Sequence, residues 1–235
     1  MGSFLKPSDS LDKKRQNSIV IAESVLAAGA LVGLNQHWYA DYPQSNFHFI
    51  NDNLEINRLE SDKIQVEKIS FNLKELIENI TISFKEFIHE NNTKCHLQID
   101  SSISDYLKGD PTKLSQIVIN LLNNAIKFSK NGDVWFTIKN LYEDEKSIKL
   151  HFEIKDNGIG IPLEKQRTIF DSFSQGSVEI NRTYGGTGLG LSIVKKILEL
   201  MDSTIHLTSE SQKGSAFSFE LQFEKGEKSE EKLVP

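Results

Sequence analysis

The chain has 235 residues, of which 26% are charged and 38% hydrophobic, and its formal net charge is −6. This length suits one domain of ordinary size with a small appendage, and the composition is that of a globular protein rather than a disordered one. The negative charge argues against nucleic acid as a partner, so an anionic ligand must be held by local donors. Cys95 is the single cysteine, which excludes an internal disulfide and a cysteine-based metal cluster. We expect a cytoplasmic chain, although the full-length protein could be attached to a membrane.

Residues 1–64 predict helices rather than a membrane anchor. Residues 1–16 are polar and poorly patterned, and their origin, native or engineered, is open. The apolar run 19–34 has the outline of an anchor, but Glu23 interrupts it, and a spanning helix needs about 20 apolar residues. We therefore expect no direct membrane insertion. Apolar positions recur at helical spacing from residue 47 onward, so residues 17–64 are predicted to form a short helical hairpin.

Residues 65–223 predict a separate α+β domain. Leu150, Phe152 and Ile154 alternate with polar residues, which is typical of a half-buried strand, and 217–223 shows the same alternation. The simplest assembly is a two-layer sandwich in which helices cover a mixed, mostly antiparallel sheet. Residues 224–235 are charged and are predicted to be a tail or linker. The predicted helices are 73–84, 111–128 and 191–201, and the predicted strands are 96–99, 134–138, 149–155 and 217–223.

The helix predicted at 111–128 carries a polar edge beside its apolar stripe. Asp110 is a good N-cap and Pro111 suits the first turn. Asn120, Asn124 and Lys127 stand at positions i, i+4 and i+7 and therefore face one place. Amide oxygens can bind Mg²⁺, and a lysine offers a point charge to phosphate. The alternative is an ordinary solvated helix face.

The segment 156–160, Asp-Asn-Gly-Ile-Gly, follows an alternating strand. A carboxylate at this place can accept a hydrogen bond from an exocyclic amino group such as that of adenine. Gly158 and Gly160 would let the backbone approach a flat ring. The alternative is a simple turn at the end of a strand.

A third segment, 185–193, reads Gly-Gly-Thr-Gly-Leu-Gly-Leu-Ser-Ile and leads into an apolar helix. Backbone N–H groups at the start of a helix form a phosphate cradle without basic side chains, which suits an acidic protein. A dinucleotide site of the Rossmann type is disfavoured because no strand of a βαβ unit precedes the loop, and the Walker pattern is absent. The alternative is a flexible loop.

Four segments resemble in order and spacing the N, first G, F and second G boxes of sensor histidine kinases. They are Asn-Leu-Leu-Asn-Asn-Ala-Ile-Lys-Phe-Ser at 120–129, the segment 156–160, Ile-Phe-Asp-Ser-Phe-Ser-Gln at 169–175, and the segment 185–193. The resemblance covers about residues 50–223 and implies the Bergerat ATP-binding fold. It implies that Asp156 binds adenine, that Asn124 and Asn120 bind Mg²⁺, that Lys127 binds phosphate, and that 170–184 forms a lid over ATP. The remaining residues that it places at the nucleotide are Gly158, Gly160, Phe170, Arg182, Gly186, Thr187, Gly188, Leu189 and Gly190.

The helical hairpin departs from the pattern of this family. Residues 51–61 resemble the end of the family's second helix, yet the His-Glu-x-x-Thr-Pro type motif of the first helix is missing. Matching the apolar run that follows that motif places Ala22 at the phosphorylated histidine and Glu23 at its acidic neighbour. His37 and His48 lie nearby, but neither has an adjacent orienting acid in the family's arrangement.

Three functions therefore compete. The first is an enzyme that binds Mg·ATP and transfers the γ-phosphoryl group to a histidine, on this chain or on another. The second is an ATP-binding pseudokinase that regulates a true kinase through dimerisation. The third, an ATP-driven clamp, lacks its companion domains. The resemblance further implies a homodimer through residues 17–64, and as partner a response regulator or a kinase that bears the histidine.

Overall fold

A computed structural model describes residues 65–171 and 188–227. The predictions that concern the hairpin at 17–64, Glu23, Arg182, Gly186 and Thr187 lie outside these ranges. The strands are β1 (Ile69–Asn72), β2 (Lys94–Ile99), β3 (Tyr106–Gly109), β4 (Asp133–Glu143), β5 (Ser147–Asp156), β6 (His206–Glu210) and β7 (Gly214–Lys225). The helices are α3 (Leu73–Ser83), α4 (Lys85–Glu90), α5 (Pro111–Phe128), α6 (Leu163–Gln166) and α8 (Gly190–Leu200).

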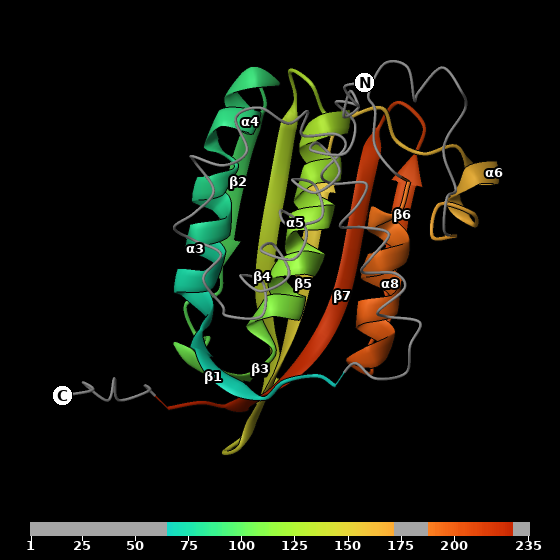
Figure 1. Ribbon diagram of the computed structural model, residues 1–235. Coiled ribbons are helices and arrows are strands. Elements are labelled where there is room, and N and C mark those ends of the chain that lie inside the picture. The colour runs from blue at the N-terminus through green and yellow to red at the C-terminus, as the bar shows by residue number, and fades with distance from the viewer. Residues whose placement is uncertain (1–64, 172–187, 228–235) are drawn as a thin grey trace, which may run out of the picture. The chain divides into compact units, whose positions relative to one another are not determined.

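Within the described ranges, the seven strands form one sheet in the order β1-β3-β7-β5-β4-β2, and β6 pairs with β7 (Figure 1). The pair β2–β4 is parallel, and the other pairs are antiparallel. β5 and β7 are in register over most of their length, with Phe152 opposite Phe219. The predicted mixed, mostly antiparallel sheet is confirmed.

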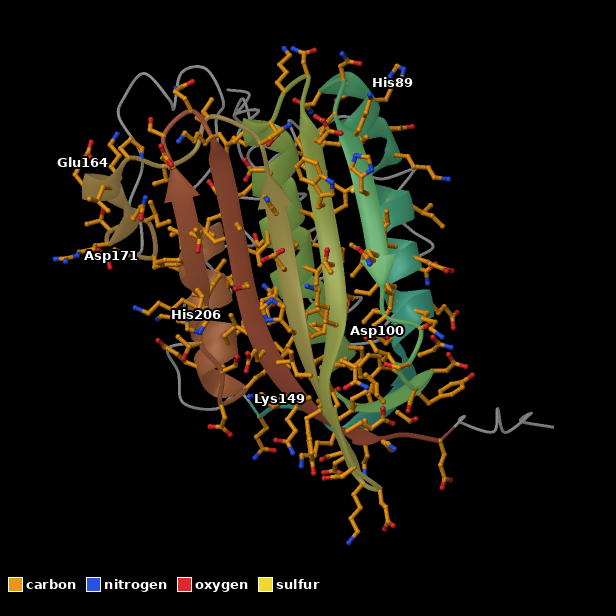
Figure 2. All side chains as sticks on the ribbon, turned by 180° about the vertical axis from the view of Figure 1, so that it is seen from behind. His89, Asp100, Lys149, Glu164, Asp171 and His206 are labelled. Carbon is orange, nitrogen blue, oxygen red and sulfur yellow. The ribbon has the colours of Figure 1, made fainter. Side chains whose placement is uncertain are left out.

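Helices α3, α5 and α8 cover one face of the sheet, and the core lies between them and the strands (Figure 1). The alternating strands explain this layering, because every second residue of β5 and β7 points toward the helices. The rings of Phe152 and Phe219 stack in this layer with centroids 4.9 Å apart. Figure 2 shows the opposite face, with Lys149 and His206 on it, and there Lys149 pairs with Glu220 at 2.7 Å. The fold is thus the predicted two-layer α+β sandwich.

The predicted elements are present, with some differences at their ends. The helix at 111–128 has the bounds that its capping residues indicated. The residues of its predicted apolar stripe are all buried: Leu114, Ile117, Val118, Leu121, Leu122 and Ala125. β4 and β5 are longer than predicted, because the pairing continues through polar residues beyond a β-bulge between Asn140 and Tyr142. The short elements β1, β3, β6, α4 and α6 had no periodic signal long enough to be predicted. None of the helices in the described ranges is long and apolar enough to cross a membrane.

Asp110 connects the start of the domain to helix α5. Its Oδ1 accepts a hydrogen bond from the backbone N–H of Lys113 at 2.9 Å, which caps the helix. Its Oδ2 accepts one from the N–H of Glu67 at 3.1 Å. Because the carboxylate is buried, both bonds are shielded from water. One side chain therefore holds the segment before β1 against the first turn of α5.

We predict that Asp110→Ala lowers the free energy of unfolding by about 1–3 kcal/mol, because a helix cap and a tie to Glu67 are lost together. Urea denaturation of the chain measures this. The matched control is Asn72→Ala, which removes the cap of α3, where Asn72 Oδ1 accepts from Glu75 N at 3.0 Å in an exposed setting. Equal losses for the two variants would contradict the added role of Asp110.

Candidate nucleotide-binding site

The polar edge of α5 faces the start of α8. Asn120, Asn124 and Lys127 are each half-buried on that edge. The amide nitrogen of Asn120 donates to the backbone carbonyl of Gln116 at 3.1 Å, which fixes the side chain along its own helix. Its Oδ1 lies so near α8 that a methyl group on Gly190 would come within 2.9 Å of it. The amide oxygen is thus presented to the first residue of α8, as the glycine-rich segment predicted.

Lys127 stands at the C-terminal end of α5, in the same row as the two asparagines. Burial lowers the pKa of its ammonium group, because the charged form has lost part of its hydration. Its Nζ lies 4.9 Å from the centre of the Phe128 ring. A ligand that brings negative charge to this place would favour the protonated form, which suits the predicted contact with phosphate.

The start of α8 offers backbone donors rather than side chains. Gly188 has φ +71°, a conformation that favours glycine, and the buried Leu189 takes the N-cap position. No described side chain caps this helix, and Ser192 Oγ instead donates to the carbonyl of Leu189 at 2.8 Å. Helices α5 and α8 pack side by side (Figure 1). The N–H groups of the first turn of α8 therefore point away from the helix without a side-chain cap, as a phosphate cradle requires.

Asp156 is buried because it continues the inward alternation of β5. It follows Leu150, Phe152 and Ile154 on the face that packs against the helices, and only 5% of its surface is exposed. Its Oδ1 accepts a hydrogen bond from Gly158 N at 2.8 Å. Burial raises the pKa of this carboxyl above its ordinary value, and the backbone N–H groups of Gly158 and Ser215 and the nearby Ser129 hydroxyl oppose that rise. The group can accept one further hydrogen bond from a buried ligand.

The glycines after Asp156 have a structural reason that differs from the predicted one. A methyl group on Gly158 would lie 2.1 Å from the carbonyl oxygen of Phe128, and one on Gly160 would lie 2.0 Å from that of Glu210. Gly160 also has φ +62°. Both glycines therefore let two stretches of protein backbone meet, where we expected the approach of a ligand ring. The loop is held in place by the ends of α5 and β6.

Phe170, the first residue of the predicted lid, packs into the domain. Its ring meets that of Phe217 edge to face, with centroids 6.4 Å apart, and it is half-buried against the core. Arg182, Gly186 and Thr187 lie outside the described residues. A separate surface hollow beside α6 and β6 contains none of the predicted ligand residues and is lined by Leu163, Glu164, Gln166, Arg167 and Leu207.

Three serines around Asp156 were not singled out from the sequence. Ser129 and Ser215 are buried, and both lie beside the carboxylate. Ser209 Oγ accepts from Ile161 N at 2.8 Å and lies 3.0 Å from Ser215 Oγ, which ties the loop after Asp156 to the β6–β7 hairpin. Ser209 lies directly opposite Ser215 in the β6–β7 pairing, which brings these two serines together. Only Ser129, inside the 120–129 segment, had a sequence signal.

Residues 109–225 match the family described as histidine kinase-, DNA gyrase B-, and HSP90-like ATPases. The chain belongs to this family. It is 35% identical over 172 residues to the signal transduction histidine-protein kinase BarA of Escherichia coli, covering 73% of this chain and 19% of BarA. It is 36% identical over 173 residues to the sensor histidine kinase AruS of Pseudomonas aeruginosa, covering 74% of this chain and 17% of AruS. The chain thus spans about a fifth of the length of these relatives.

Solved structures agree with this assignment. Full-length ShkA in complex with AMPPNP matches with a TM-score of 0.65 and 25% identity, over 77% of this chain and 36% of ShkA. The catalytic domain of the histidine kinase ThkA, in a nucleotide-free form, matches with a TM-score of 0.53 and 30% identity, over 66% of this chain and 95% of that domain. The described residues therefore form an ATP-binding catalytic domain of the sensor histidine kinase type.

We predict that Gly190→Ala weakens Mg-dependent ATP binding about ten-fold, or about 1.4 kcal/mol, because the new methyl group displaces the amide oxygen of Asn120. The fold should tolerate the change, since the end of a side chain can move. Isothermal titration with and without Mg²⁺ measures it. Gly158→Ala is the contrasting variant, because its clash is with backbone and should lower stability instead. An unchanged Mg²⁺ dependence in Gly190→Ala would contradict the assignment.

The raised pKa of Asp156 predicts two opposite pH effects. Without nucleotide, the folded protein favours the protonated carboxyl, so stability relative to Asp156→Asn is greatest below the ordinary pKa and is lost as pH rises through the raised folded pKa. ATP affinity relative to Asp156→Asn should instead fall as pH drops through that pKa, because the ionised group accepts from adenine. Urea denaturation and titrations across pH measure both. The ATP phosphates titrate in the same way with both proteins, so their effect cancels in the ratio of the wild-type affinity to the Asp156→Asn affinity. A ratio that does not change with pH would exclude Asp156 as the base acceptor.

Proposed function

We propose that this chain binds Mg·ATP between α5 and α8 and transfers the γ-phosphoryl group to a histidine in two-component signal transduction. The observation that carries the proposal is the approach of the Asn120 amide oxygen to Gly190 at the start of α8, in a domain that also holds a buried acceptor at Asp156. A phosphate cradle, cation ligands and a base acceptor are thereby combined in one domain.

Each part of the nucleotide has a partner of suitable chemistry. The oxygen of Asp156 that does not receive Gly158 N accepts from the exocyclic amino group of adenine. The first-turn N–H groups of α8 bind phosphate oxygens, and the ammonium of Lys127 adds a positive charge. We place Gly186, Thr187 and Arg182 with the phosphates on the resemblance to sensor kinases alone.

The amide oxygens of Asn120 and Asn124 fit a magnesium ion. Hard oxygen ligands are what Mg²⁺ prefers, and it keeps waters and phosphate oxygens as its other ligands, so two protein ligands suffice. When bound, the ion neutralises charge that develops on the phosphates during transfer. Asn120 is pre-positioned for this task by its hydrogen bond to Gln116, and Asn124 lies one helical turn further along α5.

In the proposed reaction, a histidine ring nitrogen attacks the γ-phosphorus in line. A nitrogen–phosphorus bond forms, the bond to the β–γ bridging oxygen breaks, and ADP leaves with the electron pair. The domain contributes positioning and charge stabilisation. Because Ala22 falls where the family carries its histidine, we propose an acceptor on a partner chain, with Glu23 as an acidic neighbour that orients it. A homodimer through residues 17–64 and a response regulator are the proposed partners.

The cytoplasm is the proposed compartment. It supplies ATP, and its reducing conditions suit the half-buried thiol of Cys95, which forms no disulfide. The second candidate function is a pseudokinase that binds ATP and regulates a kinase without transferring phosphate. The missing acceptor motif favours it, whereas the complete set of nucleotide-binding residues favours the enzyme.

The test is incubation of the chain with γ-labelled Mg·ATP, alone and with a separate histidine-bearing hairpin, followed by measurement of acid-labile label on each chain. We expect label on the added hairpin, and about ten- to hundred-fold less with Asp156→Asn at ATP concentrations below the wild-type Kd, because a charge-assisted hydrogen bond is lost. His151→Ala, on the face of the sheet opposite to α3, α5 and α8, is the control and should label as the wild type does.

The location of the label decides between the candidates. Label on this chain itself, lost in His37→Ala or His48→Ala, would show a non-standard acceptor. ATP binding with no label on either chain would contradict kinase activity and favour the pseudokinase.

A further inference from the structure

Ser129 has a fixed backbone and an unused hydroxyl. It ends α5, where its N–H donates to Ile126 O at 3.3 Å and its carbonyl accepts from Gly132 N at 2.8 Å and from Thr93 Oγ1 at 3.2 Å. Only 2% of its surface is exposed. Its Oγ is fully buried and has no hydrogen-bond partner among the residues that the structure describes. The backbone N–H and carbonyl of Ser129 are therefore hydrogen-bonded, whereas its buried hydroxyl is not bonded to any described residue.

The hydroxyl lies against the carboxylate that the base is proposed to meet. A methyl group on Gly158 would come within 2.8 Å of Ser129 Oγ, and the N–H of the same glycine donates to Asp156 Oδ1 at 2.8 Å. Ser129 is also near enough to lower the pKa of Asp156, although its hydroxyl forms no hydrogen bond with a described residue. Serine, glycine N–H and carboxylate thus share one small buried space.

Leaving a hydroxyl buried without a partner costs about 1–3 kcal/mol, so native proteins seldom do it without a reason. Hydrogen bonds in ligand sites are often long or misaligned before the ligand binds and tighten in the complex. A small movement of either side chain would let Ser129 donate to Asp156. This would recover the lost hydrogen bond at the moment when the other carboxylate oxygen receives the amino group of the base.

We propose that Ser129 is a positioning residue of the base site, whose hydroxyl completes the hydrogen bonding of Asp156 when a 6-aminopurine binds. The inference rests on the proposed function, because it takes Asp156 as the acceptor for the amino group. Ser129 acts through Asp156 and need not touch the nucleotide. Its contribution therefore depends on the amino group and should vanish for a purine that lacks it.

The charged residues near Asp156 cannot supply the hydrogen bond that we assign to Ser129. Lys155 points to the other face of the sheet, where its Nζ lies 5.9 Å from the Trp135 ring, and Asp133 is paired there with His96 at 2.8 Å. Lys127 lies on α5 in the same row as Asn120 and Asn124, and we assign it to phosphate. Removing the hydroxyl should raise the pKa of Asp156 further, because one of the interactions that oppose the rise is lost.

The test compares binding of ATP and of purine riboside triphosphate, which lacks the 6-amino group, to the wild type and to Ser129→Ala. We expect Ser129→Ala to weaken ATP binding about three- to ten-fold and to change binding of the analogue less than two-fold. In Ser129→Ala, the fall of ATP affinity at low pH should begin at a higher pH than in the wild type. Without nucleotide, the thermal midpoint should stay unchanged or rise, because an unpartnered buried hydroxyl has been removed.

The matched control is Thr93→Val, which removes a nearby buried hydroxyl that already has a partner, the Ser129 carbonyl. It should lower the thermal midpoint and leave the ratio of the two affinities unchanged. Equal weakening for ATP and the analogue in Ser129→Ala, a midpoint that falls as in Thr93→Val, or no weakening would each overturn the proposal. The wild type is measured first, so failure to prefer ATP over the analogue would locate the error in the base assignment of Asp156.

Discussion

The buried carboxylate of Asp156 is the constraint on which the rest of the site depends. An ionisable group placed at the end of a hydrophobic alternation loses hydration, and it is tolerated only if donors surround it. Those donors come from backbone that approaches very closely, which requires Gly158, Gly160 and Gly214, whose φ of +98° favours glycine. The carboxylate of Asp156 thus explains why these glycines and serines, and the ends of α5 and β7, lie together around it.

The chain enters and leaves this domain at the end of the sheet opposite to the site. β5 starts at Ser147 opposite Glu224 and ends at Asp156, and Lys68, just before β1, pairs with Glu224 at 2.9 Å. Asp110 joins this end to α5, and Asn120 lies ten residues further, or about 15 Å along a helix. A helix held by a buried cap moves as a unit. One helix therefore connects the residues before β1 with Asn120.

Sequence reasoning was strongest where a local signal and a periodic pattern coincide. Asp110-Pro111 fixed the start of α5 and its stripe fixed the buried face, so the row of Asn120, Asn124 and Lys127 could be placed before any coordinates. The serines around Asp156 come from α5, β6 and β7, and their meeting depends on strand register, which no local pattern encodes. The close approach of Gly158 to the Phe128 carbonyl was missed for the same reason, because the two residues are thirty positions apart.

The acidic composition of the chain fits the way it holds a polyphosphate. With a net charge of −6, long-range attraction would not gather ATP, and any gain must arise within the site. The first turn of α8 supplies donors whose charge is fixed and whose desolvation is already paid in folding. The ammonium of Lys127 is partly buried and has a lowered pKa, so a phosphate bound there, as we propose, would favour its charged form. Such a site discriminates by geometry rather than by charge, so it can reject other anions that a basic surface would collect.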